Sequence, residues 1–229
     1  WFDVTQYRIN PPEGGSMHWS RLLDVPVAGL IGLARLFVSP PTAEYAAVML
    51  LPILLLGVLM LLLYRTVRSL ADERAALFAA FLVPTFPLII RQFMPGRVDH
   101  HSWQIVMAAL AMLALFDRNP KRSALVMAVA LSLWMHISIE GLPYAVMIGA
   151  ILALTYLFPM ATTGQSSDTR LFPFVGGLAV FSAGLLVATQ SPGNISVPYC
   201  DAVSWPLLAA LTILSAGFGI GHFILKPKR

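Results

Sequence analysis

The residues best suited to chemistry gather in one short segment, residues 91–102, which reads RQFMPGRVDHHS. Asp99 precedes two adjacent imidazoles, His100 and His101. A carboxylate beside imidazoles can hold a hard divalent metal ion, with Asp99 and His101 as its ligands, or can act as a base oriented by its neighbours. An alternative interpretation stays open, in which Asp99 only caps a helix that begins near Ser102 and satisfies its free backbone N–H groups.

Further charged residues could complete such a site. Arg91 and Arg97 lie on the same segment and could bind phosphate oxygens through paired N–H donors. Glu140 follows His136 by four residues, which places both on one face of a helix end. Glu140 either supports the reaction or simply ends the helix at Gly141. His136 more commonly forms a hydrogen bond within a helix bundle than it ligates a metal.

A third group lies near the start of the chain. His18, Arg21 and Asp24 recur at three-residue spacing, which would place them within about a third of a helix circumference. These residues form either the solvated face of an interfacial helix or a contact with lipid phosphate. His18 and Arg21, together with Arg91, Arg97 and His100, are therefore the predicted substrate-binding residues.

The composition says what kind of protein must position these groups. Of the 229 residues, 58% are hydrophobic and only 11% are charged, too few charges to cover the surface of a soluble fold. The single cysteine, Cys200, excludes an internal disulfide framework and a Cys-rich zinc site. The sequence therefore predicts an integral membrane protein.

Apolar stretches with the length of membrane spans recur along the chain. About 20 apolar residues cross a bilayer as a helix. The pattern predicts an all-α, polytopic transmembrane bundle over residues 44–229 with about seven spans, near 44–64, 75–90, 102–116, 123–139, 142–159, 171–189 and 205–225. Pro84 and Pro87 are expected to kink the second span, because proline removes a backbone donor and clashes with the preceding turn.

The first 43 residues differ from the rest and form a separate predicted region, 1–43. Residues 1–20 are polar and typical of an ordered external loop. Residues 20–38 are apolar but include Arg21, Asp24 and Arg35, which favours a helix lying at the membrane interface over a short spanning helix. A preceding transmembrane helix would normally lead into such a loop, so we expect this chain to be part of a longer protein.

The distribution of charge predicts the orientation in the membrane. One set of alternate loops holds ten basic and four acidic residues: Arg65, Arg68, Arg74, Arg118, Lys121, Arg122, Arg170, Lys226, Lys228 and Arg229, with Asp72, Glu73, Asp117 and Asp168. The other side holds five basic and seven acidic residues: Arg8, Arg21, Arg35, Arg91 and Arg97, with Asp3, Glu13, Asp24, Glu44, Asp99, Glu140 and Asp201. The basic side is expected to be cytoplasmic, so the candidate site is external. The high isoelectric point is then a topology signal, and no nucleic-acid partner is expected.

The order of these features resembles the GT-C superfamily of polytopic glycosyltransferases, and in particular the catalytic subunit of oligosaccharyltransferases. In that group an external loop after two membrane helices carries a Gly-x-x-Asp-x-Asp-like motif. The segment FMPGRVDHH is similar to it, with Gly96 and Asp99 in matching places and His101 where the second acid would stand. The strings WFDVTQYR, PPEG, MHWSRL and GRxDHH also resemble those of a bacterial group of proteins.

The resemblance implies an inverting enzyme of the bacterial inner membrane with a periplasmic active face. It would transfer a sugar or oligosaccharide from a polyprenyl-phosphate-linked donor to an acceptor that the sequence does not identify. It implies Asp99 as metal ligand or base and a possible divalent ion, Mg²⁺ or Mn²⁺, with His101 as the departure that leaves the choice of metal open. Glu140 is the second predicted catalytic residue, in a supporting role. A transporter or flippase subunit without transferase chemistry is the alternative. The uncharged span centres disfavour it.

Overall fold

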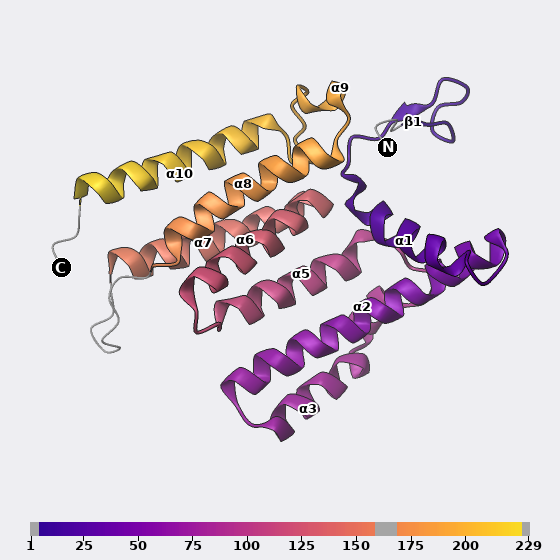
Figure 1. Ribbon diagram of the computed structural model, residues 1–229, viewed down its shortest axis with the longest axis horizontal. Coiled ribbons are helices and arrows are strands. Elements are labelled where there is room, and N and C mark those ends of the chain that lie inside the picture. The colour runs from indigo at the N-terminus through magenta and orange to yellow at the C-terminus, as the bar shows by residue number, and fades with distance from the viewer. Residues whose placement is uncertain (1–4, 159–168, 226–229) are drawn as a thin grey trace. The chain divides into compact units, whose positions relative to one another are not determined.

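The computed structural model describes residues 5–158 and 169–225 (Figure 1). Several residues used in the sequence analysis lie outside these ranges: Asp3, Pro159 at the end of the fifth predicted span, Asp168, Lys226, Lys228 and Arg229. The elements in chain order are β1 (Thr5–Gln6), β2 (Gly15–Ser16), η1 (Arg21–Leu23), α1 (Asp24–Ala34), α2 (Pro40–Leu70), α3 (Glu73–Leu82), η2 (Val83–Thr85), α4 (Pro87–Ile90), η3 (Arg91–Phe93), α5 (His100–Leu115), α6 (Pro120–Ile137), η4 (Ile139–Gly141), α7 (Leu142–Leu157), α8 (Leu171–Thr189), α9 (Pro192–Ile195) and α10 (Trp205–Leu225).

The chain divides into two compact units, each described here by itself. The α2 unit comprises residues 22–118, and the α8 unit comprises residues 1–21 together with 119–229. In the α2 unit, the long helix α2 contacts α1, α3 and α5 (Figure 1). The buried stripe of α2 repeats every four residues, as expected for a helix with one packed face: Ala43, Ala47, Leu51, Leu55 and Leu59.

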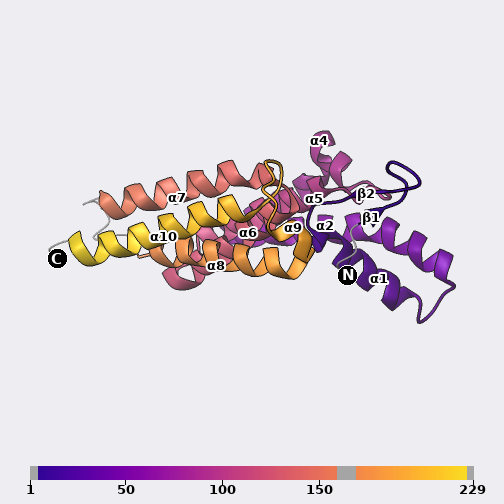
Figure 2. The same ribbon diagram turned by 90° about the horizontal axis from the view of Figure 1, so that it is seen from above.

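In the α8 unit, α8 packs against α6, α10 and α7 (Figures 1 and 2). A buried polar contact joins two of these helices. Ser182 Oγ on α8 donates to Ser132 Oγ on α6 over 3.2 Å, and His136 Nε2 lies 3.0 Å from the carbonyl oxygen of Ser182. A polar group in an apolar interior is costly unless it is paired. The interpretation of His136 as a residue that bonds within the bundle is therefore confirmed.

Helices occupy all seven predicted apolar stretches, and α8 and α10 have the predicted bounds. The number of spans is not confirmed. Within residues 5–158 and 169–225, three helices are long and apolar enough to cross a membrane, or four if a bent pair counts as one span: Pro40–Leu70, Ile139–Leu157, Leu171–Thr189, and Glu73–Thr85 with Pro87–Phe93. The physical reason is length and polarity. The apolar helix His100–Leu115 is shorter than a full span, and the first turn of α6 contains the charged residues Lys121 and Arg122.

The predicted kink in the second stretch is confirmed. The chain bends by 65° between the helical segments Glu73–Thr85 and Pro87–Phe93. Pro84 lies in η2 and Pro87 begins α4, and between them Phe86 has the extended backbone that a residue before proline favours, with φ −85° and ψ 112°. The bend brings the chain directly to the segment that contains Asp99.

The N-terminal segment that was predicted to be an ordered loop contains a short pair of strands. β1 and β2 form a small antiparallel pair in which Thr5 lies opposite Ser16 and Gln6 opposite Gly15. Gly14 has φ +80°, and a Cβ there would lie 2.6 Å from Cγ2 of Thr5, so glycine is required by both conformation and space. Residues 20–38 contain a helix, α1, that is shorter than predicted, from Asp24 to Ala34. Its position at the membrane interface stays a prediction.

Candidate functional site

The predicted carboxylate, Asp99, lies at the start of α5, in the α2 unit. Its backbone is extended (φ −76°, ψ 178°), and its Oδ1 accepts a hydrogen bond of 3.0 Å from the backbone N–H of His101. Its Oδ2 accepts a 2.6 Å hydrogen bond from Nε of Arg97. The helix-cap interpretation of Asp99 is thus correct, and the same carboxylate also forms an ion pair. We call residues 94–101 the Asp99 turn.

A tight turn places this carboxylate. The backbone N–H of Arg97 donates to the carbonyl oxygen of Met94 over 3.0 Å, with Pro95 second and Gly96 third in the turn. Gly96 has φ +86°, the value that the third residue of a type II turn needs and that other residues adopt only with strain. The N–H of Gly96 also donates to the carbonyl oxygen of Val48 over 3.3 Å, which ties the turn to α2.

The electrostatics of the turn keep Asp99 ionised. Burial raises the pKa of its carboxyl, but the hydrogen bonds from His101 and Arg97 and the charge of Arg97 outweigh burial, so the pKa lies below its usual value. The side chain of Asp99 stays 34% exposed, so a ligand can reach it. The rings of His100 and His101 stack at 4.3 Å, and Nδ1 of His101 lies 3.2 Å from Oδ1 of Asp99.

These residues fit a metal ion only in part. Among the residues that the structure describes, there is no group of three or more His, Cys, Asp or Glu side chains that could hold a metal ion. Asp99 and His101 supply two donors, and the guanidinium of Arg97 is bound to one of the carboxylate oxygens. Two donors are fewer than a divalent ion needs, so these two side chains would not hold a metal ion by themselves.

Glu140 does not share a helix face with His136, so that prediction is wrong. Helix α6 ends at Ile137, and Ser138 has extended backbone angles (φ −157°, ψ 132°) that break the helical register. Glu140 lies in the short helix η4, where its backbone N–H donates to Ser138 Oγ over 3.4 Å, and its side chain is exposed. Gly141 must be glycine, because a Cβ there would lie 2.7 Å from the ring of Trp134.

The other predicted site residues occupy three places. Arg91 begins η3 and is exposed, next to the Asp99 turn in sequence. Arg21 begins η1 and Asp24 begins α1. The prediction that His18 shares a helix face with them is wrong, because His18 precedes η1 and is not helical.

His18 belongs instead to a cluster that the sequence did not predict. Its Nε2 lies 3.0 Å from both carboxylate oxygens of Asp201, and its ring stacks on Tyr199 at 4.4 Å. Gln190 Nε2 donates to the backbone oxygen of His18 over 2.5 Å, and Ser20 Oγ donates to Thr189 Oγ1 over 3.1 Å. We call this cluster, residues 18–20 with 189–190 and 199–201, the His18 clasp. All of it lies within the α8 unit.

The family follows from a comparison with known proteins. The family model described as "Oligosaccharyl transferase STT3, N-terminal" matches residues 1–197, most of the chain. The chain belongs to this STT3 family. The resemblance inferred from FMPGRVDHH and the order of the helices is therefore confirmed.

Solved structures of an STT3-type enzyme share the fold. The oligosaccharyltransferase of Archaeoglobus fulgidus, tethered to an acceptor peptide with an NVT sequon, matches 97% of this chain with a TM-score of 0.70 and 17% sequence identity. The same archaeal enzyme in complex with zinc and sulfate matches 94% of the chain, with a TM-score of 0.66 and 18% identity. This chain covers only 27% and 29% of those chains, about a quarter of their length. No curated protein matches the sequence.

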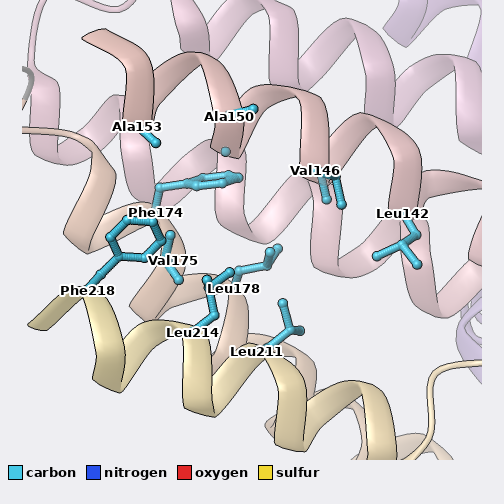
Figure 3. A pocket seen from close by; sticks show the side chains of 12 residues that line it. Leu142, Val146, Ala150, Ala153, Phe174, Val175, Leu178, Leu211, Leu214 and Phe218 are labelled. Atoms are coloured by element: carbon cyan, nitrogen blue, oxygen red, sulfur yellow. The ribbon is translucent and has the colours of Figure 1, made fainter. Parts of the chain in front are cut away.

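The STT3 family and the apolar helices together identify an integral membrane protein. Within the α8 unit, an apolar cavity of about 250 Å³ lies among α7, α8 and α10 (Figure 3). Its lining is hydrocarbon, and Figure 3 shows Val146, Leu178 and Leu214 projecting toward it from the three helices. The residues that line it include no group that could bind phosphate or transfer a proton.

Proposed function

We propose that this chain belongs to a membrane glycosyltransferase that transfers a sugar or oligosaccharide from a polyprenyl-phosphate-linked donor to an acceptor. The reaction takes place on the external, periplasmic face of a bacterial inner membrane. The observation that carries the proposal is the STT3 family match over residues 1–197. The ionised Asp99 in its Gly-x-x-Asp turn supports it, because a carboxylate that stays ionised is available to bind a cation.

The proposed roles follow the chemistry of the bond that breaks. When the sugar–oxygen bond of the donor is cleaved, negative charge develops on the phosphate that leaves. Within the α2 unit, Arg91 and Arg97 would bind that phosphate as cations, with His100 as a further donor, because fixed donors lower the energy of the charge that develops. Within the α8 unit, Arg21 and His18 are separately proposed as phosphate-binding side chains. Asp99 would either hold a metal ion or accept the proton of the acceptor. Glu140, in the α8 unit, is proposed as a supporting acid.

A divalent ion fits this account as a partner of the donor. Asp99, with His101 beside it, would hold Mg²⁺ or Mn²⁺ while the donor phosphates and water complete its coordination. Such an ion neutralises charge on the leaving phosphate. The archaeal enzyme in complex with zinc and sulfate supports the inference that the family binds metal. The transporter alternative gains nothing from the family match.

The test is the loss of the Asp99 side chain. Asp99→Ala in the whole enzyme should abolish transfer, measured with a lipid-linked oligosaccharide donor and a labelled acceptor, while membrane insertion stays intact. Both Asp99 and Asp72 cap a helix, and Asp72 accepts a 2.8 Å hydrogen bond from the N–H of Ala75. Asp72→Ala therefore removes a comparable cap, worth about 1 kcal/mol, and is the matched control that should keep transfer. Normal transfer by Asp99→Ala would refute the assignment.

A further inference from the structure

The His18 clasp holds one imidazole more firmly than an exposed loop histidine is usually held. Gln190 donates to the backbone carbonyl oxygen of His18, and two residues later the side chain of Ser20 donates to the hydroxyl of Thr189. Gln190 and Thr189, at the end of α8, are 3% and 5% exposed. The partner side chains are thus themselves fixed by packing, and residues 18–20 are anchored to the end of a long helix.

The ring of His18 is fixed separately from its backbone. Tyr199 stacks on it with the ring planes 10° apart, and the ring of Trp19 lies 5.1 Å away. Both carboxylate oxygens of Asp201 lie 3.0 Å from Nε2 of His18. Stacking and hydrogen bonding together set the plane of the ring and the direction of its two nitrogens.

This arrangement assigns different tasks to the two nitrogens. Nε2 is engaged by Asp201, so Nδ1 is the nitrogen left for a ligand. An imidazolium donates from both nitrogens at once, one proton to a carboxylate and the other to an anion. The His18 side chain is 23% exposed, so it is fixed without being sealed from solvent. Carboxylates orient functional histidines in the same way where the ring binds a metal.

We propose that Asp201 is a positioning residue for the donor: it holds His18 through Nε2, so that Nδ1 donates to a phosphate oxygen of the polyprenyl-linked substrate. This inference rests on the proposed function, which gives His18 a phosphate contact. It adds a residue from the loop before α10, far from the family motif in sequence. Asp201 itself does not touch the donor.

The test measures affinity for a defined probe, a short synthetic polyprenyl diphosphate, by calorimetry on the full chain in lipid nanodiscs. Asp201→Asn should raise the Kd about tenfold, the lower end of the loss seen when the carboxylate partner of a working histidine is removed. Asp201→Glu should restore most of the affinity, because it returns the charge. His18→Ala should weaken binding at least as much as Asp201→Asn.

A double variant separates positioning from general loss of structure. If Asp201 acts only through His18, Asp201→Asn should cause no further loss in the His18→Ala background. The matched control is Glu44→Gln, because Glu44 also forms an exposed ion pair, with Arg35 at 2.9 Å, and both acids are 57% exposed. The control should bind the probe like the unmodified chain. Melting temperatures of all variants show whether each one is folded.

The outcomes distinguish this inference from the proposed function. Unchanged affinity in Asp201→Asn, or equal losses from Asp201→Asn with and without His18, would overturn the positioning role while leaving the transferase proposal standing. If the unmodified chain does not bind the diphosphate at all, the donor class proposed above is wrong, and the role of Asp201 falls with it.

Discussion

The Asp99 turn and the His18 clasp are both polar clusters built around one carboxylate, but they assemble in opposite ways. The turn takes all its groups from residues 94–101, and a type II turn with one helix cap is enough to bring them together. The clasp joins His18 to Asp201, 183 residues later. The Asp99 turn could therefore be predicted from the spacing of neighbouring residues, whereas the His18 clasp forms only when the chain packs into its tertiary structure.

The two clusters also use their carboxylates differently. The carboxylate of Asp99 is bound by the guanidinium of Arg97, which is itself a candidate phosphate ligand. The Asp99 carboxylate and a substrate phosphate would therefore compete for the positive charge of Arg97. Asp201 is bound by Nε2 of His18, and the other ring nitrogen, Nδ1, does not take part in this contact. Variants at the partner residues should therefore affect the two regions unequally.

The largest expected effect in this comparison comes from the partner of Asp99. Arg97→Leu removes a charge-assisted hydrogen bond of 2.6 Å and a candidate phosphate contact, so transfer should fall by on the order of tenfold or more. Arg97→Lys should recover part of the rate, because it keeps the charge but loses the Nε geometry. Initial rates of sugar transfer are the measurement.

The control for that prediction is Arg35→Leu, which breaks an exposed ion pair of 2.9 Å to Glu44. Exposed pairs contribute little, so its transfer rate should stay near that of the unmodified enzyme. Equal transfer rates for Arg97→Leu and the unmodified enzyme would show that sugar transfer does not depend on the Arg97–Asp99 ion pair. The proposed difference between the partners of Asp99 and Asp201 would then be wrong.

A smaller effect is expected from acid. The pKa of Asp201 is lowered, first by the hydrogen bond from His18, and the pKa of Asp99 is lowered as well. A carboxylate with a lowered folded-state pKa contributes stability above its unfolded value, near ~4, and loses that contribution as the pH falls through the folded-state pKa. The melting temperature should therefore fall as the pH drops below about 4.

Two variants sharpen this pH prediction. Asp99→Asn and Asp201→Asn should each flatten the acid limb of the curve of melting temperature against pH, because an amide does not titrate there. A curve that keeps its full slope in both variants would show that other carboxylates cause the acid loss.

Sequence reasoning predicted the helices well where the pattern was regular. The apolar runs that became α8 and α10 contain no charge, so their ends are marked by polar residues, and their bounds are as predicted. The kink was predictable because proline has a fixed conformational effect. The number of spans was not, because a count of apolar stretches gives no weight to the length and polarity that separate α5 and α6 from full spans.

Only the part of the candidate site that lies within one short segment, the Asp99 turn, could be predicted from the sequence. Gly96, Asp99 and His101 act within one turn, so their spacing in the sequence is informative. Glu140 was placed on the wrong face because nothing in the sequence marked Ser138 as the residue where α6 breaks. The clasp left no pattern, since Tyr199 and Asp201 reach His18 only through the packing of α8 and the loop after it.

The central claim is that Asp99 does more than cap α5, and Asp99→Asn tests it most directly. Asparagine keeps a side-chain oxygen that can accept the N–H of His101, so the cap survives while the charge and the basic oxygen are lost. The measurement is sugar transfer by the whole enzyme carrying Asp99→Asn, beside Asp72→Asn at the cap of α3. The account predicts that transfer is lost only in Asp99→Asn, with the melting temperature of both near that of the unmodified protein. Full transfer by Asp99→Asn would contradict it and reduce Asp99 to a helix cap.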